Sequence, residues 1–249
     1  MVKKEAVVPA VIPEAELPVV DSNATWGAAE EIESSDLLVG KIYHQQALSK
    51  FVQDGQAQPG DWCDSLTGEV LAKRDAPLDV IIFSSFKRLL ISAKLPGSNK
   101  YEFQEAQEVT LQNCNLPWEE ETPNGSIKRQ LQYSYFCLIP GKELDLPLVL
   151  SLSSTKIKVA KKLNTMIAKL ARLNRPSASV IFQLKSVKET GDKGSWFGAE
   201  VTQGAPTTKD QLQAAHDWYK QIKASTVVVA EEHGDHDTAV TTDDDTIPF

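Results

Sequence analysis

The sequence is poor in cysteine and lacks any long apolar run. Three cysteines among 249 residues, Cys63, Cys114 and Cys137, are too few and too scattered for a disulfide scaffold or a zinc site, and favour a reducing compartment. No stretch approaches the roughly 18 apolar residues that cross a membrane. Prolines and acids interrupt any secretion signal near the N-terminus. We therefore expect a cytoplasmic protein.

The residue patterns of common enzymes are also missing. Phosphate-binding loops of the forms Gly-x-x-x-x-Gly-Lys-Ser/Thr and Gly-x-Gly-x-x-Gly do not occur. No Cys/His or Ser/His pair has a spacing typical of nucleophilic catalysis, and His44 and His216 stand alone. The segment 233–237 contains His and Asp, but it lies in a tail with nothing to orient metal ligands. We predict a protein that is not an enzyme, with no catalytic residue, metal or cofactor.

Positive charge is scarce at both ends of the chain. Residues 1–36 carry two lysines against eight acids, and residues 227–249 carry seven acids and no Lys or Arg. Residues 37–226 hold 24 Lys and Arg against 19 Asp and Glu, so the net charge of −8 conceals a basic body between acidic ends. Such asymmetry is typical of interaction tails and of proteins that bind nucleic acid.

Hydrophobic periodicity predicts a domain over residues 37–225, between disordered acidic segments at 1–36 and 226–249. Its strands fall at 78–83, 86–94, 127–139, 147–152, 179–187 and 195–203, and its helices at 156–173 and 208–224. We expect Thr155 to cap the first helix and Thr208 with Gln211 to form a capping box on the second. The second helix is expected to bury Leu212, Ala215, Tyr219 and Ile222. The region between 95 and 126 has an irregular pattern.

The expected order is several strands, a helix, a two-stranded hairpin and a C-terminal helix. It is similar to the order of three strands, a helix and two strands in an oligonucleotide-binding (OB) barrel. We therefore predict a mainly β fold with helices, in which an OB-like antiparallel barrel has one helix between its third and fourth strands and a C-terminal helix. A different α+β barrel or sandwich with an antiparallel sheet has nearly the same order.

The last seven residues, Asp243-Asp-Asp-Thr-Ile-Pro-Phe249, carry a specific pattern of acids before an apolar end. This tip resembles the C-terminus of bacterial single-stranded DNA-binding proteins, from which it departs by the inserted Thr246. The resemblance implies docking on replication and repair proteins, and it favours a phage-type protein in a bacterial or infected host cytoplasm. The docking residues that it implies are Asp243, Asp244, Asp245, Ile247, Pro248 and Phe249. A generic solubilising tail is the alternative.

Residues 146–188 contain no Asp or Glu but nine Lys or Arg, a patch suited to phosphates. On the helix at 156–173 these cations either steer DNA or only solvate the outer face. Strand alternation also places aromatic rings beside cations or amides, as in grooves that stack unpaired bases, whereas Tyr133 and Tyr135 fall on a core face. The candidate DNA-binding residues are Phe86, Arg88, Lys94, Lys128, Gln132, Phe136, Lys185, Lys188, Lys193 and Trp196.

Together these patterns predict a protein that binds single-stranded DNA with little sequence preference during replication, recombination or repair. Its acidic tip would recruit partners and would also occupy the cationic groove when DNA is absent. Two alternatives remain open at this point. One is a regulatory protein that docks on replication or transcription machinery without binding DNA, and the other is a strand-annealing recombination mediator.

Overall fold

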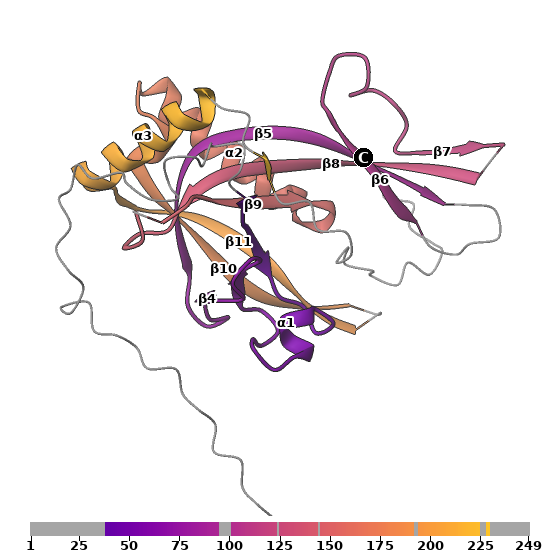
Figure 1. Ribbon diagram of the computed structural model, residues 1–249, viewed down its shortest axis with the longest axis horizontal. Coiled ribbons are helices and arrows are strands. Elements are labelled where there is room, and N and C mark those ends of the chain that lie inside the picture. The colour runs from indigo at the N-terminus through magenta and orange to yellow at the C-terminus, as the bar shows by residue number, and fades with distance from the viewer. Residues whose placement is uncertain are drawn as a thin grey trace, which may run out of the picture. The chain divides into compact units, whose positions relative to one another are not determined.

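The computed structural model is mainly β (Figure 1). The chain divides into two units, Met1–Glu33 and Ser34–Phe249, and every described residue belongs to the second. The structure describes residues 38–94, 101–123, 125–143, 145–191, 194–224 and 228–229. The expected disordered segments, 1–36 and 226–249, lie outside this set except for 228–229.

Twelve strands and three α-helices are found in the described residues. The strands are β1 (Leu38–Val39), β2 (Lys41–His44), β3 (Trp62–Asp64), β4 (Val70–Ala72), β5 (Leu78–Lys94), β6 (Glu102–Glu108), β7 (Glu119–Thr122), β8 (Gly125–Leu138), β9 (Leu148–Ser153), β10 (Val180–Gly191), β11 (Gly194–Pro206) and β12 (Val228–Val229). The helices are α1 (Lys50–Gln53), α2 (Ile157–Arg172) and α3 (Lys209–Ala224), with 3-10 turns η4 (Ser154–Lys156) and η5 (Ser177–Ser179).

Ten strands form one sheet, in the order β11-β10-β5-β8-β9-β2-β3-β4, with β6 added along part of β5 and β7 along part of β8. Neighbouring strands are antiparallel except for β2 and β9, which run parallel. Separately, β1 pairs with β12. The ends of β5 and β8 that carry β6 and β7 form a four-stranded extension, which we call the arm (Figure 1).

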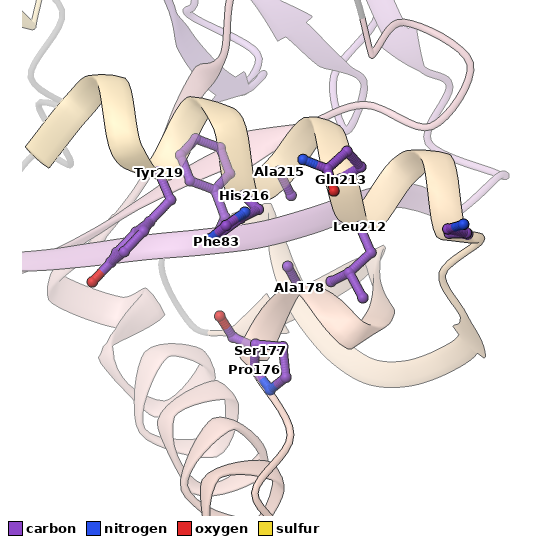
Figure 2. A pocket seen from close by; sticks show the side chains of 10 residues that line it. Phe83, Pro176, Ser177, Ala178, Leu212, Gln213, Ala215, His216 and Tyr219 are labelled. Atoms are coloured by element: carbon purple, nitrogen blue, oxygen red, sulfur yellow. The ribbon is translucent and has the colours of Figure 1, made fainter.

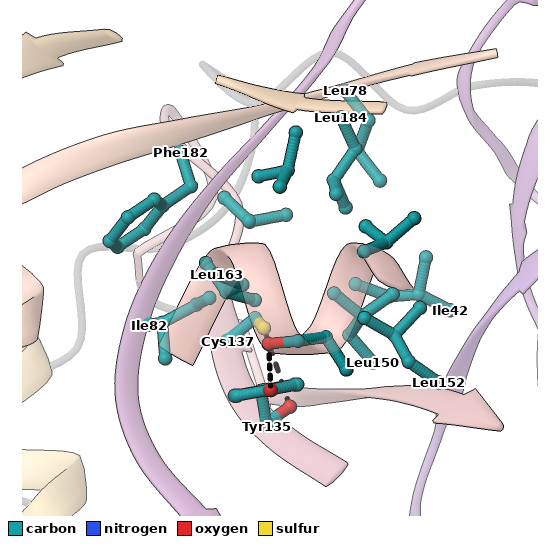
Figure 3. Close-up of a cluster of buried hydrophobic side chains, with 14 of the residues drawn as sticks. Ile42, Leu78, Ile82, Tyr135, Cys137, Leu150, Leu152, Leu163, Phe182 and Leu184 are labelled. Atoms are coloured by element: carbon teal, nitrogen blue, oxygen red, sulfur yellow. Dashed lines mark hydrogen bonds between the residues drawn. The ribbon is translucent and has the colours of Figure 1, made fainter. Parts of the chain in front are cut away.

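The sheet curls around α2 into a half-barrel. Strands from both ends of the strand order contribute to one core, in which Trp62 of β3 and Val201 of β11 belong to the same buried cluster as Leu163 of α2. Figure 3 shows apolar side chains of this cluster, among them Ile82, Leu163 and Phe182, gathered around the helix. The Tyr135 hydroxyl of β8 donates to Asn164 Oδ1 of α2 at 2.8 Å, so the one polar group of that ring is satisfied inside the core.

The opposite face of β5 and β8 is covered at one end by α3. Ala215 of α3 is fully buried and packs in a second cluster with Ile81, Phe83 and Phe136. The helix begins with the expected capping box, because the Gln211 N–H donates to Thr208 Oγ1 at 3.2 Å and the Thr208 N–H donates to Gln211 Oε1 at 3.0 Å.

Most of the expected elements are present, with longer strands than the sequence indicated. The segments at 78–83 and 86–94 are a single strand, β5, interrupted by a bulge between Ile82 and Ser84. Residues 95–126, expected to be irregular, contain β6 and β7. Both strands are rich in Glu and Gln, which weakens the apolar alternation on which strand prediction depends.

Two local expectations at the helices are wrong. Thr155 does not cap α2; it lies inside η4, and Lys156 occupies the N-cap position without a side-chain hydrogen bond. Tyr219 of α3 was expected to be buried by its helical spacing, but it is 38% exposed. The Tyr219 side chain borders an open groove beside residues 176–178, so one side of the ring meets no other part of the described chain.

All three cysteines are free, with Cys63 and Cys137 buried and Cys114 exposed. Among the described residues, no helix combines the length and the hydrophobicity needed to cross a lipid bilayer.

Candidate functional site

One face of β5 and β8 carries six of the candidate residues. In the antiparallel register, Phe86 lies opposite Ser134, Arg88 opposite Gln132 and Lys94 opposite Ser126. Directly opposed residues point to the same side of a sheet, and alternation extends this face along both strands. The structure therefore brings together Phe86, Arg88, Lys94, Lys128, Gln132 and Phe136 on what we call the arm face.

The end of this face nearest α3 is closed. Phe136 is only 6% exposed and belongs to the cluster beneath α3, so its ring is part of the core. The Phe86 ring lies 5.5 Å from it and is partly buried. The Arg88 guanidinium stands over the Phe86 ring at 4.9 Å, a cation–π contact that places a charge at the boundary of the core.

The other end of the arm face is open and holds a cluster of aromatic rings around one cation. Lys128 Nζ lies 4.0 Å from the centroid of the Trp118 ring and 5.3 Å from that of Tyr101. Lys94 Nζ approaches the Tyr101 ring from the neighbouring strand, at 6.0 Å. Trp118 is 55% exposed. We call Lys94, Tyr101, Trp118 and Lys128 the arm cluster.

Tyr101 and Trp118 were not among the candidates drawn from the sequence. Trp118 follows Asn115-Leu-Pro, and Tyr101 precedes a Glu-rich strand, so neither stands in an alternating pattern with a cation. One feature of the sequence could have identified Trp118 as a binding residue. It is a tryptophan in a polar, proline-containing insert, where a large aromatic side chain is expected to be exposed. Only the pairing of β7 with β8 brings that insert beside Lys128.

Acids oppose the cations of the arm. Glu119 lies opposite Lys128 and Glu108 lies opposite Arg88 in the strand register. The Tyr101 hydroxyl donates to the Glu119 carboxylate, and the pKa of Tyr101 is raised by partial burial and by this bond. The arm therefore offers aromatic surface and positioned cations, but little excess positive charge.

The excess charge lies on α2. Its side away from the core carries the exposed cations Lys158, Lys161, Lys162, Lys169 and Arg172, which we call the α2 stripe. At 1.5 Å per residue the stripe extends over about 21 Å. Within the described chain no ion pair joins these side chains to a carboxylate. The stripe is therefore free to neutralise phosphates.

The β10–β11 hairpin separates the remaining candidates. Trp196 lies opposite Glu189 and Lys185 opposite Glu200 on one face, whereas Lys188 lies on the other face, opposite Phe197. The Trp196 indole N–H donates to Glu189 Oε2 at 2.9 Å, and the side chain is 39% exposed. Lys193 lies outside the described residues.

The tip candidates, Asp243, Asp244, Asp245, Ile247, Pro248 and Phe249, also lie outside the described residues. In the part of the chain that the structure describes, no three His, Cys, Asp or Glu side chains are close enough together to hold a metal ion.

His44 is buried at the end of β2 and stacks on Trp62 with ring centroids 4.1 Å apart. The Ser186 hydroxyl donates to the Gly60 carbonyl and so accepts from His44 Nε2, which lies 2.8 Å away. His44 Nδ1 is buried without a hydrogen-bond partner among the described residues. Burial, together with the positive charge of Lys156, lowers the pKa of His44 to about 3.

This burial predicts an acid-sensitive fold. The pKa of His44 is about 3 in the folded chain and 6.5 in the unfolded chain, so between these values the unfolded chain binds a proton that the folded chain does not. The contribution of neutral His44 to the free energy of unfolding is therefore complete above pH 6.5. It is lost as the pH falls toward 3, at about 1.4 kcal/mol per pH unit. The neutral variant His44→Gln lacks this term. Urea unfolding should show that the stability gap between the two proteins narrows by about 3 kcal/mol from pH 7 to pH 4; a constant gap would contradict the assignment.

The curled sheet and the cation–aromatic arm define a mainly β protein of barrel-like type. The family model described as Pam3 phage gp34-like protein matches residues 13–228. The chain belongs to this family, which makes it a phage protein. No curated protein and no solved structure matches it.

Proposed function

We propose that the chain binds single-stranded DNA with little sequence preference during phage replication, recombination or repair. The observation that carries the proposal is the arm cluster, where Lys128 stands 4.0 Å from the ring of a largely exposed Trp118. Proteins that bind single strands combine aromatic platforms for bases with cations for phosphates. In this proposal the acidic tip recruits replication and repair proteins.

A base and the Lys128 ammonium compete for the same ring. The ammonium covers one face of Trp118 in the free protein, as an exposed cation–π contact worth about 0.5–1 kcal/mol. Base stacking is worth about 1–3 kcal/mol, so a base displaces the cation. The displaced ammonium then lies within reach of the phosphate attached to that base.

The topology supports an OB-like interpretation of the fold. With the arm strands β6 and β7 set aside, the order β5, β8, β9, α2, β10 and β11 is that of an OB-fold, and β10 pairs with β5. OB-folds bind oligonucleotides with the loop between strands 1 and 2 and the loop between strands 4 and 5. In this chain the first of these is the arm, and the second is the hairpin tip beside Trp196.

The test is fluorescence anisotropy with a labelled single-stranded oligonucleotide and its duplex at several salt concentrations. The slope of log K against log salt is about −0.7 per phosphate neutralised on a single strand. The three arm cations, Arg88, Lys94 and Lys128, would give about −2, and adding the five of the α2 stripe would give about −6. Equal binding to the duplex, or no binding even without residues 243–249, would overturn the proposal.

Trp196→Ala should lower the affinity for single-stranded DNA about 5- to 100-fold, the loss expected for one stacked base. The side chain is partly exposed and its indole N–H bonds only Glu189 among the described residues, so the fold should be retained. Trp196→Phe keeps an aromatic platform and serves as the control. An unchanged affinity in Trp196→Ala, with an unchanged circular dichroism spectrum, would remove the hairpin from the DNA-binding surface.

A further inference from the structure

An apolar groove lies between α3 and the segment that leads into β10 (Figure 2). Its volume is about 640 Å³, within the range of small-ligand sites. Apolar side chains line most of it: Phe83, Pro176, Ala178, Leu212, Ala215 and Tyr219. The exposed side of Tyr219 is part of this lining, which is why that ring is less buried than its helical spacing indicates.

Positive charge stands at the rim of the groove. Lys209 lines it at the start of α3. Arg175 immediately precedes the lining residue Pro176, is exposed, and contacts the Ser179 carbonyl at 3.4 Å. Two acids lie on α3. Asp210 follows Lys209 in the first turn and is exposed, and the Asp217 carboxylate accepts from the Gln213 amide at 3.0 Å and lies 3.8 Å from Lys220. The groove is therefore an apolar floor whose lining carries one cation, Lys209, and no acid, with Arg175 beside it in the chain.

The C-terminal tip of the same chain has the complementary chemistry. Ile247, Pro248 and Phe249 form an apolar end the size of a small ligand, and proline limits the conformational entropy that this end loses on binding. The acids at 243–245 supply negative charge for the rim. These acids and the apolar residues 247–249 thus match a groove with a cationic edge.

The connecting chain is long enough. The groove is lined by residues 209–219 of α3, so its middle lies about 15 Å along the helix from Ala224, at 1.5 Å per residue. β12 pairs with β1, so the tether to the tip is counted from Val229, and 17 residues, 230–246, separate it from Ile247. At about 3.5 Å per residue those 17 residues span up to about 60 Å, whereas Val229 is at most about 18 Å of chain from Ala224. The tip can therefore reach the groove of its own chain.

We propose that the groove between α3 and Pro176–Ala178 is a docking site for the tip of the same chain, with Phe249 seated against Leu212, Ala215 and Tyr219. The site lies outside the arm face. While the tip occupies this groove, it is not accessible to the replication and repair proteins that it recruits in the proposed function. Such a partner binds the tip by competing with the groove, and this competition does not require DNA.

The test uses a fluorescent peptide of the sequence Asp-Asp-Asp-Thr-Ile-Pro-Phe and no nucleic acid. A chain ending at residue 242 should bind this peptide at least tenfold more tightly than the full chain. The reason is that a tethered tip, at an effective concentration on the order of 1 mM, competes for the groove. The same peptide without its final Phe should bind at least tenfold more weakly, because the anchor is missing.

Variants of the truncated chain locate the site. Lys209→Glu and Tyr219→Ala change exposed or half-exposed side chains of the groove, and each should weaken peptide binding about fivefold or more. Lys73→Glu makes the same charge change at an exposed lysine outside the groove and the DNA-binding surface, and is the control. Amide resonances of residues 209–219 should shift between the truncated and full chains.

No peptide binding, equal binding to both chains, or a loss in Lys73→Glu equal to that in Lys209→Glu would overturn the proposal. Self-association of the full chain that disappears on truncation would also overturn the proposal, because it would place the tip in the groove of a second copy. Because the readout contains no DNA, these outcomes are distinguishable from a failure of the proposed function.

Discussion

Replacing Tyr101 and Trp118 together by alanine is expected to lower the affinity for single-stranded DNA at least 30-fold. Each ring that stacks a base contributes about 1–3 kcal/mol, and losing two such platforms removes at least about 2 kcal/mol. Both rings lie beside the Lys128 ammonium, so the double variant also leaves that ammonium without these aromatic neighbours. The measurement is anisotropy at fixed salt.

The matched control is the double variant Tyr101→Phe/Trp118→Phe, which keeps both platforms and should bind nearly as the parent does. A second control, Leu111→Ala, alters an exposed apolar side chain in the same insert. The alanine variant should unfold at nearly the parental temperature, since Trp118 is largely exposed and Tyr101 lies at the start of a strand on the arm. Parental affinity in a folded alanine variant would show that the arm cluster does not bind DNA.

Alternation alone predicts that Phe86 and Arg88 share one face of their strand and that Lys128 and Gln132 share one face of theirs. That the two faces lie on the same side of the sheet depends on the pairing register, which the structure supplies. The bulge between Ile82 and Ser84 leaves the prediction intact, since it precedes Phe86. The core position of Tyr135 follows from the same period. It is fully buried among the apolar residues around α2.

Alternation could not show what covers each part of that face. Phe136 and Lys128 lie on the same side of β8, but α3 packs over only the end that carries Phe136. This helix begins at Lys209, 71 residues after β8 ends at Leu138. The two aromatic rings of the arm cluster were missed for a related reason. Their proximity to Lys128 is a long-range pairing of an insert whose own composition favours no regular structure.

The α2 stripe is expected to supply most of the phosphate contacts, because each of the arm cations Arg88 and Lys128 already has a glutamate opposite it. Replacing Lys158, Lys161, Lys162 and Lys169 by glutamine preserves helix propensity and leaves the buried side of α2 untouched. Four lost contacts should reduce the salt slope by about 2.8 and lower the affinity at 0.1 M salt roughly 600-fold relative to the parent.

A control variant with four other exposed lysines changed distinguishes direct phosphate contact by α2 from long-range electrostatic attraction of DNA. Lys50, Lys73, Lys220 and Lys223 lie outside α2, and changing them to glutamine alters the net charge by the same amount. If the stripe contacts phosphates, only the α2 variant loses slope, because counterions are released where phosphates are neutralised. Equal, small losses in both variants would mean that α2 only steers DNA toward the protein. An unchanged slope in the α2 variant would assign its lysines to solvation of the helix and leave the arm as the whole binding surface.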